Sequence, residues 1–141
     1  MVLGKKFFYW LLFFFIFLSS ISMSGCKAEK YDDTKIADLE YTVVPEQDIP
    51  SGVKDIIENS KNENVRKTYL DQDYLYIIIC YGPQPTTGYS ISIEDIYEAE
   101  KAIFVSSMLK GPSKTEKAID TVTYPYLVLK LKYNDKAVIF H

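Results

Sequence analysis

The sequence predicts a mostly β (α+β) fold: an antiparallel β-sandwich or barrel-like domain with one short helix. Three observations favour this fold class. Short apolar and aromatic runs recur about every eight to twelve residues, separated by turn residues. The chain holds 12 tyrosines and 8 phenylalanines, which are residue types enriched in strands. Beyond the N-terminal apolar run, a single stretch near residue 50 has apolar residues at helical spacing.

The first 25 residues have the pattern of a bacterial lipoprotein signal peptide. Lys5 and Lys6 are followed by the apolar run Phe7–Leu18, and serines then lead to Gly25 and Cys26. A run of this length is typical of a signal peptide and too short for a stable membrane-spanning helix. We expect cleavage before Cys26, which would then carry lipid. An uncleaved anchor and an ordinary secretory peptide are the alternatives.

The mature chain, residues 26–141, is acidic. Removing Lys5 and Lys6 leaves 14 of the 16 basic residues against all 19 acidic ones, a net charge of −5. The sequence has no basic patch, which argues against a nucleic-acid partner. Membrane contact is therefore expected only through lipid on Cys26, which would anchor an extracytoplasmic protein to the bacterial cell membrane.

Residues 26–38 are polar and charged. We expect them to form a tether that holds one domain, residues 39–141, away from the membrane. Leu39–Val44 alternates and predicts a first strand, which Pro45 ends.

The predicted helix begins after Pro50. Val53, Ile56 and Ile57 recur at helical spacing, and the polar residues 59–62 end the segment. One face of this helix is expected to pack on a sheet.

A β-hairpin is predicted next. Val65–Leu70 and Tyr74–Tyr81 are strand-like and are separated by Asp71-Gln72-Asp73. We interpret the two aspartates as turn residues, because calcium requires six to eight oxygen ligands. Cys80 lies within the apolar run and is interpreted as a small buried hydrophobe, without a disulfide partner if Cys26 is lipidated.

The same patterns predict further strands at residues 89–93, 102–105, 119–122, 126–133 and 137–140. Residues 94–101 predict a turn or bulge, and residues 108–118 a long polar connection. Because Asn134-Asp135 indicates a turn, we expect the last strand to form a hairpin with the strand before it.

The loop Gly82-Pro83-Gln84-Pro85-Thr86-Thr87-Gly88 stands between two of these strands. Its prolines fix φ and remove backbone donors, and its glycines free φ. The loop holds no group suited to acid–base chemistry, and a shaped loop on a β scaffold indicates recognition. The alternative is a plain hairpin connection, in which Gly88 supplies a positive φ and Tyr89 belongs to the core.

Four segments, taken together and in order, resemble the PrcB family: residues 76–79, 82–91, 111–113 and 123–131. That family is named for a lipoprotein subunit of a surface protease complex. The resemblance implies a non-catalytic accessory subunit that binds or stabilises a partner, such as an exported protease or another envelope protein.

Eight residues are the predicted partner contacts: Gln84, Pro85, Thr86, Thr87, Gly88, Tyr89, Tyr124 and Tyr126. Tyr124 and Tyr126 flank Pro125 at the start of a strand. Alternation predicts that one of them points inward, so at most one is expected to contact a partner.

A second resemblance implies a different function. Residues 85–89 are similar to one loop of the chagasin-type inhibitors, immunoglobulin-like domains that insert loops into papain-like cysteine proteases. The loop at Gly111-Pro112 lacks the Gly-X-Gly of those inhibitors, and no Arg precedes Pro125. Protease inhibition is thus an alternative, and an envelope scaffold with no protease link is another.

An enzyme is not expected. The single histidine, His141, is the last residue of the sequence, where fraying is common. The sequence has no cluster with metal-ligand spacing and no phosphate-binding glycine loop. We therefore predict no cofactor, no metal and no catalytic residue.

Overall fold

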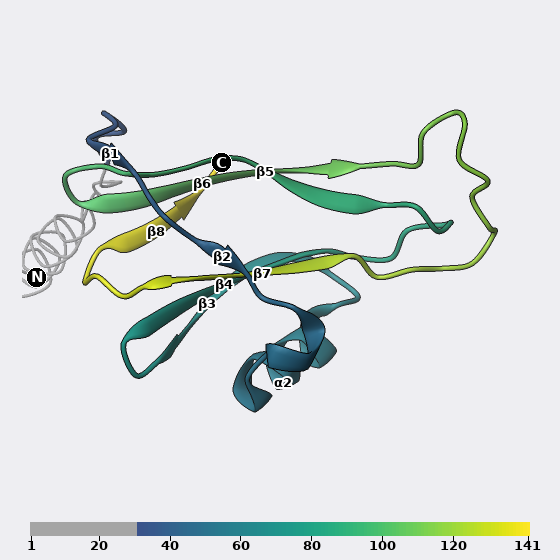
Figure 1. The fold of residues 1–141 in the computed structure, drawn as a ribbon, viewed down its shortest axis with the longest axis horizontal. Coiled ribbons are helices and arrows are strands. Elements are labelled where there is room, and N and C mark those ends of the chain that lie inside the picture. The colour runs from purple at the N-terminus through teal and green to yellow at the C-terminus, as the bar shows by residue number, and fades with distance from the viewer. Residues whose placement is uncertain (1–30) are drawn as a thin grey trace, which may run out of the picture. The chain divides into compact units, whose positions relative to one another are not determined.

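The computed structural model describes residues 31–141, so Cys26 and the predicted signal peptide lie outside the described residues. Two four-stranded sheets face each other (Figure 1). In spatial order, the first sheet contains β1 (Ala37–Asp38), β5 (Ser90–Glu98), β6 (Ala102–Lys110) and β8 (Ala137–Phe140). The second contains β2 (Thr42–Val43), β7 (Tyr126–Lys132), β4 (Tyr74–Tyr81) and β3 (Asn64–Asp71).

The predicted fold class is confirmed. The sheets form a sandwich and do not close into a barrel. Within residues 31–141, every pairing of strands is antiparallel except that of β6 with β8. The hairpin of β3 and β4 matches its prediction, with Asp71 opposite Tyr74 and a two-residue turn between them.

The main core lies between the two sheets. Its fully buried members are Leu75, Ile77, Ile79, Ile96, Ile103, Val105, Leu129 and Leu131. Ile96 comes from β5, and the other members alternate along β4, β6 and β7, as expected for strands with one face turned toward the opposite sheet.

The predicted helix is α2 (Ser51–Ser60), which follows the short 3-10 helix η1 (Glu46–Asp48). It covers the outer face of the second sheet, where Val53 and Ile57 pack against Tyr76, Ile78 and Cys80. Strand β4 is therefore buried on both faces. This double burial explains the unbroken apolar run of β4, which is typical of a strand between two packed layers.

A smaller cluster covers the outer face of the first sheet. Ala99, Ala102 and Phe104 are buried there, with Tyr97 stacked on Phe104 at 5.2 Å between ring centroids. His141 also stacks on Phe104, at 5.1 Å, and its backbone N–H donates to Val105 O. The C-terminal residue thus pairs with β6, although the sequence predicted fraying there.

The predicted first strand, Leu39–Val44, is divided between the two sheets. Leu39 donates to Ile96 O in the first sheet, and Val44 donates to Val128 O in the second. Ala37 and Asp38, which the sequence placed in the tether, pair with β5 as strand β1. The sheet therefore begins before residue 39.

The last strand was predicted wrongly. Strand β8 pairs in parallel with β6 of the first sheet and forms no hairpin with β7. Strand β7 already has β4 along one side and β2 on the other, so β8 does not pair with β7 and instead joins β6 in the first sheet.

Two other boundaries differ from the sequence-based expectation. Strand β5 continues to Glu98 through an irregularity between Ile93 and Asp95, which fits the bulge alternative. Residues 119–122 form no strand and are exposed. None of the helices within residues 31–141 is long and apolar enough to cross a membrane.

Replacement of Ile77 by Ala tests the core. Ile77 is fully buried between the sheets, so Ile77→Ala is expected to lower the free energy of unfolding by about 2–5 kcal/mol. Denaturant unfolding measures this loss. In the control, Ile119→Ala at a 65% exposed side chain, the change should stay within about 0.5 kcal/mol. Equal losses in the two variants would contradict the assigned core.

Candidate protein-binding surface

The loop at residues 82–88 joins strands of different sheets, since β4 lies in the second sheet and β5 in the first. It is therefore not the hairpin connection that the sequence allowed as the alternative. Gly82 and Gly88 do have positive φ, of 73° and 88°. The loop lies beside the long connection from β6 to β7, which extends beyond the strands (Figure 1).

Backbone hydrogen bonds join this loop to that connection. Gln84 N–H donates to Thr123 O at 2.8 Å, and Thr123 N–H donates to Gln84 O at 2.9 Å. Thr87 N–H donates to Ile119 O at 3.0 Å. We call residues 82–89 and 119–124 together the two-loop surface.

The two predicted contact threonines also hold the loops together. Thr87 Oγ1 accepts from Ile119 N–H at 3.0 Å, and Thr86 Oγ1 donates to Thr87 O at 3.1 Å. Thr123 Oγ1 donates to Thr86 O at 2.8 Å. Both threonines are half-buried, so the structure uses their hydroxyls to fix the shape of the surface.

The base of the two-loop surface is closely packed. A Cβ added at Gly88 would lie 2.8 Å from Pro112 Cβ, and one added at Gly111 would lie 3.4 Å from Tyr89 Cε1. Tyr89 is half-buried. Gly88, Gly111 and Tyr89 thus set how closely the loop at residues 82–89 approaches residues 111–112 of the connection from β6 to β7.

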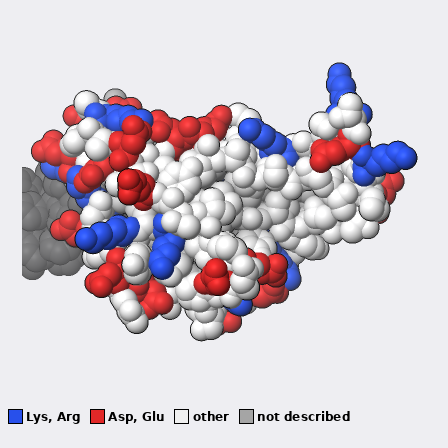
Figure 2. Space-filling view, viewed as in Figure 1, with Lys and Arg blue, Asp and Glu red and all other residues white. Residues whose placement is uncertain are grey.

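Exposed apolar side chains gather on the same surface. Ile119 is 65% exposed, Val122 56% and Tyr124 40%, and Pro83 and Pro85 are exposed beside them. On the face shown in Figure 2, charged side chains cluster at the left and at the far right tip, and the surface between them is largely uncharged. Ile119 and Val122 were missed as contacts because their alternation resembled a strand.

Tyr124 and Tyr126 point to different environments. Tyr124 is exposed, with the Lys61 ammonium 5.9 Å from its ring centroid. Tyr126 packs against the buried cluster under α2. Burial, followed by the nearby charges of Glu46 and Glu58, raises the pKa of its phenol. Of the two, Tyr124 alone is placed to contact a partner.

Cys80 is fully buried under α2. Burial raises the pKa of its thiol, and the Lys67 charge offsets that shift only in part. A thiol in this environment is unreactive, which agrees with a packing role.

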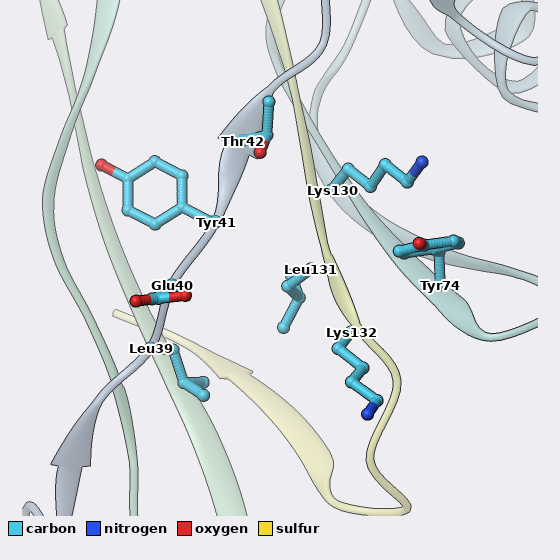
Figure 3. Close-up of a pocket in the computed structure, with 8 residues that line it drawn as sticks. All are labelled: Leu39, Glu40, Tyr41, Thr42, Tyr74, Lys130, Leu131 and Lys132. Atoms are coloured by element: carbon cyan, nitrogen blue, oxygen red, sulfur yellow. The ribbon is translucent and has the colours of Figure 1, made fainter.

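A separate groove of about 750 Å³ lies at the opposite ends of β4 and β7 from the two-loop surface. It opens where the chain crosses from the first sheet to the second, between Leu39 and Thr42. Figure 3 shows Lys130 and Tyr74 on one side of β7 and Tyr41 on the other side of the groove. The Lys130 ammonium lies 3.7 Å from the Tyr74 ring centroid. This lining holds no pair of acid and base groups in contact.

Residues 31–141 contain no group of three or more His, Cys, Asp or Glu residues that could hold a metal ion. The only histidine of the sequence, His141, stacks on Phe104.

A known protein family matches the part of the chain that contains both loops of the two-loop surface. Residues 75–132 match the PrcB C-terminal family model. The match confirms the resemblance predicted from the sequence, and the matched segment runs from β4 to the end of β7. No curated protein and no solved structure matched the chain. The similarity to chagasin-type inhibitors is not shown by these comparisons.

A substitution at Gly88 tests the close packing of the loop at residues 82–89 against Pro112. Gly88→Ala places a Cβ 2.8 Å from Pro112 at a φ of +88°, so it should lower the free energy of unfolding by about 1–3 kcal/mol. Thermal or denaturant unfolding measures the loss. Gly111→Ala is the control, because its Cβ meets nothing closer than 3.4 Å. A larger loss for Gly111→Ala than for Gly88→Ala would contradict this packing.

Proposed function

We propose that this protein is a lipid-anchored, non-catalytic accessory subunit of an exported protease complex. It would bind its partner through the two-loop surface. The observation that carries the proposal is the exposed apolar set Ile119, Val122 and Tyr124, held in place by the paired backbones of Gln84 and Thr123.

The physical argument concerns the cost of binding. Loops that are already ordered lose little conformational entropy when a partner docks. Exposed apolar residues next to one another mark protein–protein contact sites more often than single ones do. Here the backbone and threonine hydrogen bonds fix the loops before binding, and the apolar side chains supply the contact area.

The match to the PrcB C-terminal family supports a protease complex as the assembly that this protein would join. The partner would therefore be a protein of that complex outside the cytoplasmic membrane. The proposed stabilising role needs no catalytic group in this chain. No contact of the described residues specifically favours inhibition or a scaffold role.

The lipid anchor is proposed from the residues before the described region. Gly25-Cys26 follows an apolar run and a serine-rich segment, the pattern expected for lipid attachment. Lipid would hold an acidic domain at a membrane that its charge does not attract.

Site-specific photocross-linking tests the binding surface. A photoreactive residue at position 119 in the full chain, expressed in its own cell, is expected to cross-link to a subunit of an exported protease. Position 36 is the control, because Ile36 is 63% exposed and Ile119 is 65% exposed. The same products from both positions, or none from position 119, would refute the proposed surface.

Substitution provides the energetic arm of that test. Ile119→Ser should weaken co-purification of the cross-linked partner about fivefold to thirtyfold, the usual range for loss of a central apolar contact. Ile36→Ser should leave recovery unchanged. Quantitative mass spectrometry of the purified complex measures both.

Globomycin tests the anchor independently of the partner. Inhibition of the lipoprotein signal peptidase should make an uncleaved precursor accumulate, and Cys26→Ser should release the protein from the membrane fraction. An unchanged mature band in treated cells would exclude lipoprotein processing at Cys26.

A further inference from the structure

Strand β3 is an unusually long open edge in this fold. The sheets end at β1 and β8 in one case and at β2 and β3 in the other. Strands β1 and β2 have two residues each and β8 has four, whereas β3 has eight. Along one side β3 pairs with β4 without a register shift. Along its other side no strand within residues 31–141 follows.

The hairpin register shows which backbone groups of β3 face outward. Asp71 and Tyr74 flank a two-residue turn, so they exchange hydrogen bonds with each other. Because direction alternates along a strand, Tyr69 also bonds toward β4. The N–H and C=O groups of Arg66, Thr68 and Leu70 therefore point to the open side.

The usual protection of an edge strand is incomplete here. Proteins guard edges with proline, bulges, short strands or outward lysines, and β3 has neither proline nor bulge. Its two cations are turned onto the domain: Lys67 Nζ donates to Ser60 Oγ at 2.7 Å, and the Arg66 guanidinium lies 4.8 Å from the Tyr81 ring centroid. Leu70 on the same strand is 49% exposed.

The charge pattern along β3 identifies the occupant. Arg66 and Lys67 are in its first half, and Asp71 and Asp73 lie at its turn end. A second copy running antiparallel would place the basic half of one strand near the acidic end of the other. We propose that two copies of this protein pair through β3 about a two-fold axis at Thr68, forming one continuous sheet.

The position of the axis follows from the outward groups. An axis at Thr68 places Thr68 opposite Thr68 of the second copy and Arg66 opposite Leu70, so all three outward residues bond in both copies. Lys67 then lies opposite Tyr69 and not opposite a second Lys67. An axis at Lys67 would oppose like charges directly, which destabilises a sheet.

The pairing has a consequence for the two-loop surface. Strand β3 begins at Asn64 opposite Tyr81, just before Gly82, and ends at the far turn. Antiparallel copies therefore carry their two-loop surfaces at opposite ends of the dimer. The dimer would be bivalent, and its existence is independent of which partner those surfaces bind.

Cysteine cross-linking of the full chain in mild detergent tests the dimer. Thr68→Cys places two thiols in a hydrogen-bonded pair about 5.5 Å apart between Cα atoms, within disulfide reach. Oxidation should give a covalent dimer well above the wild-type background. Leu70→Cys is the matched control, because it faces Arg66 of the second copy. Equal cross-linking by the two variants, or none by Thr68→Cys, would overturn the proposal.

Light scattering of the same preparations provides the second measurement. The wild-type chain is expected to have the mass of two chains, whereas Thr68→Pro should have the mass of one. Thr68→Pro should still fold and unfold cooperatively, because the lost N–H faces away from β4. A one-chain mass for wild type at its highest soluble concentration would also overturn the proposal.

Discussion

The rest of the structure depends on the burial of β4 on both faces. Ile77 and Ile79 face the opposite sheet, while Ile78 and Cys80 face α2. Because both faces are covered, β4 anchors the helix, the hairpin with β3 and the ladder with β7 at once. The loop at residues 82–88 leaves directly from this strand. A rigid start is what allows such a loop to hold a fixed position far from the core.

In the two-loop surface, polar side chains are bonded within the protein and apolar side chains are exposed. Its hydrophilic members, Gln84, Thr86 and Thr87, bond to neighbouring backbone, and its apolar members remain in solvent. This distribution is the reverse of a typical surface loop, where polar groups bind water. Apolar side chains exposed next to one another mark protein contact sites, which is why we propose that a partner covers this surface.

The sequence was sufficient where local pattern and packing agree. The α2 helix, the β3–β4 hairpin and the bulge near Glu94 follow from periodicity and turn chemistry. The sequence was insufficient for predicting which sheet a strand joins, because the alternation of side chains along a strand does not specify the neighbouring strand. Strand β8 therefore went to β6, and residues 119–122 became a loop braced by Thr87. The loop was identified from its prolines and glycines, but its apolar contacts came from a segment more than 30 residues away.

The open edge of β3 and the two-loop surface both adjoin the β3–β4 hairpin. Tyr81 connects them: its ring receives Arg66 from β3, and its hydroxyl donates to Ser107 O in the first sheet at 2.7 Å. That hydrogen bond occupies a carbonyl of β6 beyond the end of β8, where β6 would otherwise present a second open edge. One side chain thus occupies an outward carbonyl of β6, and within residues 31–141 no hydrogen bond reaches the outward backbone groups of Arg66, Thr68 and Leu70. The difference between the two edges is the physical reason to expect strand addition at β3 and not at β6.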